Sequence, residues 1–316
     1  MERANGGTGL VCLTVVDIRS TIRSRPLIVP ETAKKNRIAL FSGAPAQKFQ
    51  AATPFLKWAG GKSELLPEIA KRLPRSFNTY WEPFLGGGAL FFALSPAEAV
   101  LLDVNEELVN CYQVVKTDVD ALIAELSTHR NSPSHFLHVR NMRPWQLDPI
   151  RRAARVIFLN KTCFNGLYRV NQRGEFNVPF GHYLNPNFCD ERTLRAASRV
   201  LRNTEILCRD FRVLLYKAQP GDLIYFDPPY DPLSSTSSFT SYSESPFGIR
   251  EQKALAAVFK ALDDRKCRVM LSNSDTPFIR KLYRRFQIEP VLASRAINCN
   301  GAKRGKISEL IIRNYE

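Results

Sequence analysis

Residues 223–230 read LIYFDPPY, which places an acid, two prolines and a phenol directly after a run of strand formers. Four apolar residues without a break predict a strand buried on both faces, as in parallel α/β sheets. Ligands of such sheets bind outside the carboxyl ends of the strands, so Asp227 and Tyr230 are predicted to line a cleft. Pro228 and Pro229 fix φ and restrict the residue before each, which makes the turn stiff.

A stiff turn with these groups can hold an amino group that is attached to an aromatic ring. The Asp227 carboxylate and the backbone carbonyl of Pro228 are two acceptors for the two hydrogens of an –NH₂ group. A hydrogen bond to a charged acceptor is worth about 1.5–3 kcal/mol, and two of them favour a pyramidal nitrogen with a free lone pair. Tyr230 offers a face for stacking, worth about 1–3 kcal/mol per base. A simple proline turn after a buried strand explains the prolines but not the Asp–Tyr pair.

Strands and helices alternate on both sides of this turn. Further strands are predicted at 79–84, 99–104, 268–273 and 307–315, and helices at 63–73, 150–160 and 190–201. Leu255, Val258, Phe259 and Leu262 mark another helical face. The alternation predicts the α/β class with a mostly parallel sheet, interrupted by an inserted subdomain.

Charge is distributed unevenly over the 316 residues, whose formal net charge is +15. Residues 118–204 carry 13 basic and 7 acidic side chains, whereas 53–117 and 205–275 are each close to neutral. This segregation favours a polyanion bound by the basic insert, although a generally basic solvated surface is the alternative. We therefore divide the chain into an α/β domain (53–117 and 205–316), a basic inserted domain (118–204) and an N-terminal extension of uncertain order (1–52).

A second candidate site lies in EPFLGGGALFF, where glycines 86–88 stand between a predicted strand and a helix. Glycine there lets the backbone approach a ligand closely. Asp103 ends the next predicted strand, where a carboxylate can accept both hydroxyl protons of a ribose. The spacing does not match the dinucleotide fingerprint GxGxxG, and LKWAGGKS lacks the first glycine of a P-loop. A nucleoside with a compact charged tail fits these residues, with Trp58 and Lys62 as further candidates.

Five separated motifs resemble the Dam-type adenine-specific DNA methyltransferases, in the order of that family and over residues 53–316. They are FLKWAGGK (55–62), EPFLGGG (82–88), LLDVN (101–105), NGLYRVNQRGEFNVPFGHY (165–183) and DPPY (227–230). The resemblance implies a Rossmann-like S-adenosylmethionine-dependent methyltransferase sheet with an inserted, mainly helical DNA-recognition subdomain. It also implies S-adenosyl-L-methionine as the cofactor, held by Trp58, Lys62, Asp103 and Asp227 and supported by Glu82, Gly86 and Gly88.

The same resemblance implies a site-specific transfer of a methyl group to N6 of adenine. The catalytic residues would be Asp227, Pro228, Pro229 and Tyr230, which hold an adenine extruded from double-stranded DNA because its N6 is unreachable inside the stack. Displacement would be direct and in line, without a metal ion or a covalent enzyme intermediate.

Residues of the insert are implied to read the DNA. By resemblance, Leu167, Arg169 and Pro179 read base edges, Lys57 reads the outer base, Phe164 wedges into the duplex and Asn165 follows it. His182 departs from the arginine often found at its position, which puts one phosphate contact in doubt. Because the base-reading positions match, GATC is the expected target.

Two alternatives remain at this point. One is a methyltransferase acting on another amine, such as cytosine N4 or RNA adenine, and the other is an inactive DNA-binding relative. No apolar run approaches the length of a membrane span, and the start of the chain lacks a convincing cleavage site. We expect a bacterial or phage-type protein of the cytoplasm that is associated with the nucleoid, works as a monomer and needs no protein partner.

Overall fold

The computed structural model of the chain describes residues 36–37, 52–62, 64–232, 247–294 and 306–316. The predicted extension 1–52 therefore lies almost wholly outside the described residues. Of this extension, only the two-residue strand at 36–37 and Ala52 are described; the strand pairs with Ser76 and Phe77 as a short antiparallel ladder.

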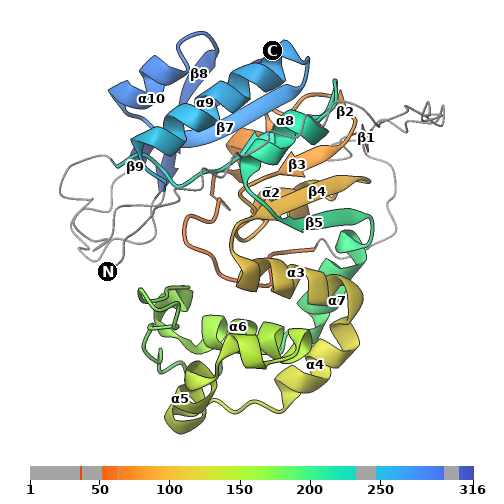
Figure 1. Ribbon diagram of the computed structural model, residues 1–316, viewed down its shortest axis with the longest axis vertical. Helices are drawn as coiled ribbons and strands as arrows, with labels where there is room; N and C mark the ends of the chain where they lie inside the picture. Colours follow the sequence, from red (N-terminus) through yellow and green to blue (C-terminus); the bar gives the residue numbers. More distant parts are fainter. Residues whose placement is uncertain (1–35, 38–51, 63, 233–246, 295–305) are drawn as a thin grey trace, which may run out of the picture. The chain divides into compact units, whose positions relative to one another are not determined.

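Within the described residues, seven strands form one sheet in the order β5-β4-β3-β6-β7-β9-β8. The first five run parallel to one another (Figure 1). Strand β9 runs antiparallel to β7, and β8 runs antiparallel to β9. In chain order the strands are β1 (Asn36–Arg37), β2 (Ser76–Phe77), β3 (Tyr80–Glu82), β4 (Ala99–Asp103), β5 (Thr204–Cys208), β6 (Leu223–Phe226), β7 (Arg268–Ser274), β8 (Gln287–Ser294) and β9 (Lys306–Arg313). This mostly parallel sheet confirms the predicted Rossmann-like α/β class.

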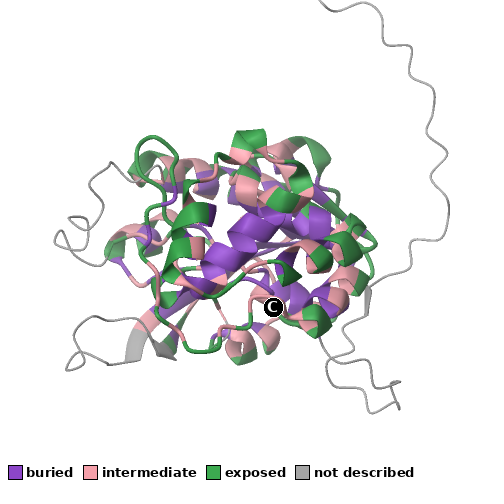
Figure 2. Cartoon of the chain, turned by 90° about the horizontal axis from the view of Figure 1, so that it is seen from below, coloured by how far each residue is buried: buried purple, intermediate pink, exposed green. Residues whose placement is uncertain are grey.

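Both faces of the sheet are buried, which explains the unbroken apolar runs. Along β6, Leu223 and Tyr225 belong to one apolar cluster, while Ile224 and Phe226 belong to a second cluster on the other face. The same alternation of period two runs through β4, β7 and β9, because successive side chains of a strand point to opposite faces. Figure 2 shows the buried residues gathered in the interior of the fold and the exposed residues around its outside.

Helices cover the two faces of the sheet. The α-helices are α1 (Leu66–Ala70), α2 (Ala89–Leu94), α3 (Glu106–Thr117), α4 (Val119–Ser127), α5 (Pro133–Asn141), α6 (Pro149–Thr162), α7 (Glu191–Leu201), α8 (Leu214–Lys217), α9 (Ile249–Asp264) and α10 (Pro277–Leu282), and the 3₁₀ turns are η1 (Pro144–Gln146), η2 (Phe164–Gly166) and η3 (Phe211–Val213). Residues of α8, α9 and α10 join the second cluster, and residues of α1, α2 and α3 join the first.

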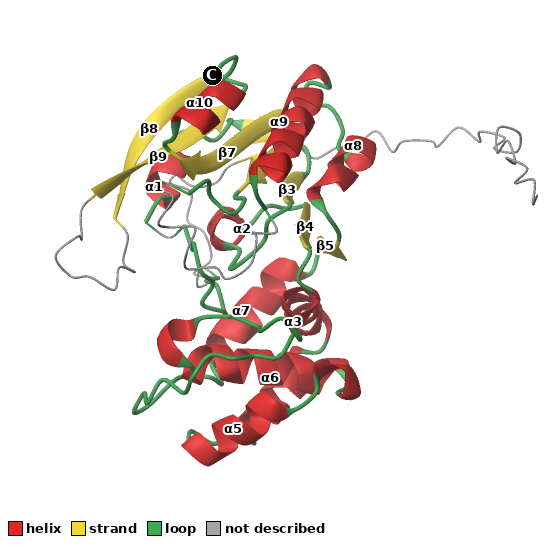
Figure 3. Ribbon diagram, turned by 60° about the vertical axis from the view of Figure 1, so that its left-hand side comes forward, coloured by secondary structure: helices red, strands yellow, loops and turns green. Residues whose placement is uncertain are grey.

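The insert between β4 and β5 is mainly helical. Helices α4, α6 and α7 pack against α3, and α5 packs against α6 on the side away from α3. In both Figure 1 and Figure 3 this group lies away from β8 and β9. Their apolar side chains, such as Leu122, Phe158 and Leu201, continue the first cluster of the sheet. The insert therefore shares a core with the sheet and does not hang from it by a linker.

The strand order reverses between β3 and β6. From β3 the chain passes outward through β4 to β5 and then returns to β6 on the other side of β3. Ligand sites of open α/β sheets lie at such a switch point, outside the carboxyl ends of the strands. Glu82 ends β3, Asp103 ends β4 and Asp227 follows β6, so the predicted carboxylates share this edge.

The structure contains two edge strands that we did not predict and a helix shorter than predicted. Strand β5 includes the exposed Glu205, and β8 contains Pro290, a residue that strands tolerate at an edge. Helix α1 begins only at Leu66, with Pro67 in its first turn, whereas we predicted residues 63–73. Ser63, the predicted start of that helix, lies outside the described residues.

Candidate active site

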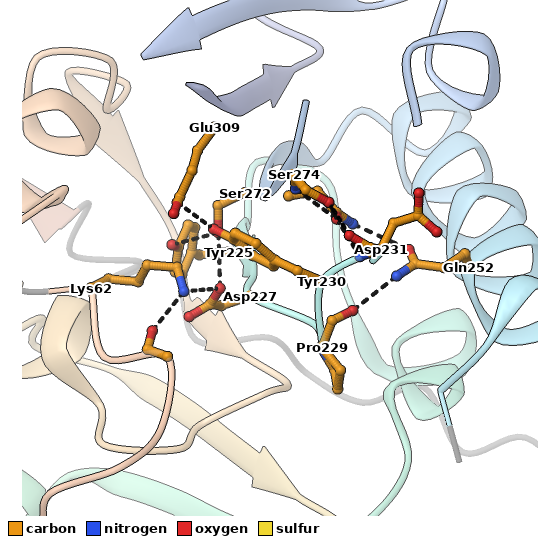
Figure 4. A network of polar contacts seen from close by, with 12 residues as sticks. Lys62, Tyr225, Asp227, Pro229, Tyr230, Asp231, Gln252, Ser272, Ser274 and Glu309 are labelled. Atoms are coloured by element: carbon orange, nitrogen blue, oxygen red, sulfur yellow. Dashed lines mark hydrogen bonds and ion pairs between the residues drawn. The ribbon is translucent and has the colours of Figure 1, made fainter. Parts of the chain in front are cut away.

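The turn after β6 brings together three residues that the sequence analysis singled out. Lys62 Nζ lies 2.8 Å from Asp227 Oδ1 and 4.5 Å from the centroid of the Tyr230 ring (Figure 4). The same ammonium donates to the Gly60 carbonyl at 2.6 Å, which anchors it to the loop before α1. Lys62 thus balances the charge of Asp227 and covers part of the Tyr230 ring.

A polar group from the neighbouring strand supports Asp227 from behind. Ser272 on β7 donates to Asp227 Oδ1 at 3.0 Å, and its hydroxyl lies 3.0 Å from that of the buried Tyr225. Since β7 pairs directly with β6, Ser272 belongs to the same sheet edge. Ser272 therefore holds one carboxylate oxygen of Asp227 and is itself held by Tyr225.

The backbone beyond the prolines is held by α9 and β7. Gln252 of α9 donates to the Pro229 carbonyl at 2.9 Å, and Asn273 of β7 accepts from the Asp231 N–H at 3.1 Å. Asn273 also donates to Gln252 at 3.2 Å, which closes the network. Two stiff proline φ angles are therefore reinforced by two hydrogen bonds from outside the turn, and the two side chains that form them are bonded to each other.

Burial dominates the electrostatics of this turn. It raises the pKa of Asp227, and the ion pair with Lys62 opposes that shift. Burial also raises the pKa of Tyr230 well above its usual value, with a further rise from the charge of Asp227. The phenol consequently stays protonated, and Asp227 needs a higher pH than an ordinary aspartate to ionise fully.

Glu82, at the end of β3, is a buried carboxyl with a neutral partner. It is 3% exposed and accepts a hydrogen bond of 2.8 Å from the Tyr80 hydroxyl. Burial raises its pKa from 4.5 to about 8, and the nearby charge of Asp227 adds to the rise. Glu82 is therefore largely protonated at neutral pH.

Replacing Glu82 by Gln is expected to remove a pH dependence of stability. The folded pKa lies above the unfolded value, so the unfolded chain loses this proton first and stability falls as the pH rises from about 4.5 to about 8. Urea unfolding should show Glu82→Gln more stable than the wild type by a few kcal/mol at pH 8 and similar to it at pH 4.5. Glu205→Gln, on the exposed edge, is the control; parallel curves for Glu82→Gln and the wild type would contradict the shift.

The glycine loop packs tightly between Trp58 and Asp103. Gly86 has φ +48°, and a Cβ at this position would lie 2.9 Å from Trp58 Cδ1. Its N–H donates to Asp103 Oδ2 at 3.1 Å, while Asn105 N–H donates to Oδ1 at 2.9 Å. At Gly88, a Cβ would lie 2.8 Å from the Tyr112 hydroxyl oxygen. Glycine is thus required here for space as well as for backbone conformation.

The segment 57–58 also contacts the recognition insert. Lys57 N–H donates to Asn160 Oδ1 at 2.8 Å, and Asn160 Nδ2 donates to the carbonyls of Lys57 at 2.7 Å and Gly166 at 2.9 Å. Trp58 stacks on Tyr168 with ring centroids 5.2 Å apart. The residues predicted to bind cofactor and to read DNA are therefore physically joined.

The predicted DNA-reading residues lie close together around η2. Phe164 is 52% exposed, and its N–H donates to the Pro179 carbonyl at 2.9 Å. Asn165 N–H donates to the Tyr183 hydroxyl at 3.0 Å, and Lys57 Nζ lies 5.3 Å from the same ring. An exposed aromatic at a rigid turn is the arrangement that an intercalating wedge requires.

Arg169 is exposed but held in place. Its Nε donates to Asn177 Oδ1 at 2.7 Å and its guanidinium reaches the Asn177 carbonyl at 3.3 Å. Leu167, two residues earlier, is half-buried against the first apolar cluster. Arg169 is therefore held by hydrogen bonds to Asn177, whereas Leu167 is held by apolar packing.

Several residues of this site escaped the sequence analysis. Ser272 and Asn273 stand in a polar run, SNSD, at the end of a predicted strand, a signal that could have been followed. Asn160 and Tyr168 have no such signal, because a single polar residue in a helix or an aromatic in a loop has many ordinary explanations.

The described residues offer neither a metal cluster nor a membrane-spanning helix. No group of three or more His, Cys, Asp and Glu side chains in the described ranges has the geometry of a metal site. Among the same residues, no helix is long and apolar enough to span a membrane.

Comparisons with known proteins agree on one family. The family model for D12 class N6 adenine-specific DNA methyltransferases matches residues 58–297. The type II methyltransferase M.MjaIII of Methanocaldococcus jannaschii is 46% identical over 83% of this chain and 99% of its own length. The type II methyltransferase M1.LlaDCHI of Lactococcus lactis is 44% identical over 83% of this chain and 95% of its own. The DNA adenine methylase of Escherichia coli is 36% identical, with coverages of 81% and 93%.

Proposed function

The chain belongs to the D12 class of N6 adenine-specific DNA methyltransferases, and from this premise we propose that it methylates a flipped adenine within GATC in duplex DNA. The observation that carries the proposal is the turn at 227–230. There, a carboxylate and a protonated phenol lie on one stiff backbone, with a cation 2.8 Å from the carboxylate. Extrusion of the base follows from chemistry, because N6 of a stacked and paired adenine is out of reach.

The residues of the turn have distinct tasks in this proposal. Asp227 and the Pro228 carbonyl accept the two amine hydrogens and leave the nitrogen lone pair free, while Tyr230 stacks on the base. Bound S-adenosyl-L-methionine supplies an electrophilic methyl group on a sulfonium sulfur. Lys62, released from Asp227 as the amine arrives, becomes available to an anionic group of the cofactor.

The glycine loop fits this cofactor. Asp103 retains lone pairs for ribose hydroxyls beside its two backbone donors, and the next residue, Val104, is 69% exposed and offers an apolar surface. Trp58 packs against Gly86 and leaves no room for a side chain at position 86. We therefore assign Trp58, Lys62, Asp103 and Asp227 to cofactor binding, with Glu82, Gly86 and Gly88 supporting them.

Gly86→Ala is expected to weaken cofactor binding at least tenfold. The new methyl group must displace Trp58, and alanine at a positive φ costs about 1–2 kcal/mol. Gly174→Ala is a matched control, because Gly174 has φ +76° but a Cβ at its position would meet no atom within 4 Å. Calorimetric titration with S-adenosylhomocysteine should show the loss for Gly86→Ala alone, and equal affinities of the two variants would refute the assignment.

The recognition domain is proposed to comprise residues 118–204, between catalytic segments 53–117 and 205–316. Support comes from the placement of Lys57, Phe164, Asn165, Leu167, Arg169 and Pro179 in one region around η2, with basic helices behind it. Phosphate contacts by arginines would position the duplex, and these six residues would read or open it. Since the target is short, we also propose that a monomer suffices and that it acts at the nucleoid.

Arg169→Ala should relax discrimination at one base pair of the target by roughly tenfold or more, because a bidentate arginine contact is worth about 1–3 kcal/mol of specificity. Methylation rates on GATC duplexes and on singly substituted duplexes measure this ratio. Arg173→Ala, at the exposed tip of the same loop, should slow all duplexes alike. Equal losses on cognate and substituted DNA for Arg169→Ala would reassign Arg169 to the phosphate backbone.

The whole proposal is tested with the purified full chain. Labelled methyl groups should pass from S-adenosyl-L-methionine to adenine in plasmid DNA, and restriction enzymes sensitive to methylation at GATC should then report protection. Methylation at a different sequence would overturn the target alone. Absence of any transfer would overturn the activity of this chain.

A further inference from the structure

Strand β9 places a carboxylate beside the catalytic turn. Glu309 pairs in register with Ser274 of β7, so it lies at the same sheet edge as Asp227. It is 6% exposed, and Leu310, Ile311 and Ile312 after it are buried in the two apolar clusters. Burial of a carboxylate is costly unless it forms a hydrogen bond, so Glu309 is expected to have a partner.

The partner of Glu309 is the phenol of the catalytic turn. The Tyr230 hydroxyl donates to Glu309 Oε2 at 2.9 Å, and the two residues are 79 positions apart in the chain (Figure 4). Because burial and nearby negative charges raise the pKa of Tyr230, the phenol remains a donor at ordinary pH. The ring is therefore fixed at its hydroxyl end by β9 and at its backbone by the prolines.

Glu309 also acts on Asp227 through space. Its negative charge contributes to raising the pKa of Asp227, after the larger effect of burial. Among the described residues, six titratable groups affect the pKa of Asp227 or of the groups around it: Lys62, Tyr80, Glu82, Tyr225, Tyr230 and Glu309. Lys62 is the cation among them, so removing Glu309 shifts the balance towards positive charge.

We propose that Glu309 is a positioning residue of the methyl-transfer site, which holds the Tyr230 ring in the orientation that stacks on the target adenine. Stacking depends on where the ring lies, and the hydrogen bond to Glu309 fixes the hydroxyl end of the ring, so that without this acceptor the side chain can swing about χ1. This inference rests on the proposed function, because it takes Tyr230 as the stacking residue. It adds strand β9 to the elements that build the site.

Four variants of the full chain test the proposal: E309A, E309Q, Y230F and the double variant E309A/Y230F. Steady-state methyl transfer to a duplex oligonucleotide is followed as a function of pH. E309A and Y230F should each lower kcat/KM by about tenfold, because each removes the same charged hydrogen bond. The double variant should be no slower than the slower single one. E309Q keeps an acceptor and should stay within about threefold of the wild type at neutral pH.

The pH profile separates positioning from a merely structural role. In E309Q the charge that raises the pKa of Asp227 is gone, so the acid limb should move to lower pH. Wild-type rates and an unmoved acid limb in both Glu309 variants would overturn the inference and leave the proposed function standing. Independent, multiplicative losses in the double variant would also overturn it. If E309A fails to fold, E309Q and Y230F still decide. A wild-type chain without adenine methylation would overturn the proposed function and this inference together.

Discussion

Asp227→Ala is expected to reduce methyl transfer by about 10²–10³-fold while the chain stays folded. The substitution removes the charged acceptor of one amine hydrogen, and losing one such preorganised group typically costs this much in rate. It also leaves Lys62 without the carboxylate that lies 2.8 Å away, so the ammonium loses its ion-pair partner. Tyr230→Ala should cause a comparable loss through stacking.

Transfer of labelled methyl groups under single-turnover conditions, with DNA and cofactor saturating, measures the chemical step for Asp227→Ala. Asp264→Ala is the matched control, because Asp264 is an exposed carboxylate at the end of α9 and lies outside the proposed site. Circular dichroism establishes that both variants fold. Near-normal turnover of Asp227→Ala would contradict the role of the turn at 227–230.

The fold was largely predictable from the sequence where burial leaves a pattern. Strands β3, β4, β6, β7 and β9 are apolar enough on both faces to be recognised. The helices between β3, β4, β6 and β7 also indicated their parallel direction, whereas β9 runs antiparallel to β7. The edge strands β5 and β8 were missed because an edge strand does not need an unbroken run of apolar residues. Glu205 faces solvent on β5, and Pro290 removes a ladder donor from β8 without harm.

The site was predictable only where its residues are adjacent in the chain. The turn at 227–230 and the glycines 86–88 carry their chemistry in a few consecutive residues. Glu309 and Ser272 bond to side chains of the turn from 79 and 45 positions away, and Asn160 bonds to the backbone of Lys57 from 103 positions away. A local sequence pattern does not predict a hydrogen bond between a polar side chain and a residue far away in the chain. Such residues are therefore identified only from the structure.

Asn160 is the clearest example of such a residue, because it links two functional segments. It is 1% exposed, lies in the last turn of α6 and forms three hydrogen bonds of 2.7–2.9 Å. Two of these bonds bind the backbone of Lys57, beside the proposed cofactor residue Trp58. The third binds the Gly166 carbonyl, beside the proposed base reader Leu167. A single amide thereby sets the distance between the cofactor loop and the recognition loop.

Asn160→Ala should lower the free energy of unfolding by roughly 3 kcal/mol or more, because one N–H and two carbonyls lose their partners in a buried place, at about 1–3 kcal/mol each. In folded protein, Lys57 should no longer be fixed relative to Gly166, so KM for DNA should rise more than kcat falls. Urea unfolding and steady-state methylation measure the two effects. Asn110→Ala, which loses one exposed hydrogen bond of 3.0 Å to the Pro149 carbonyl, is the control. If Asn160→Ala proves as stable and as active as Asn110→Ala, the link between the two loops does not depend on this side chain.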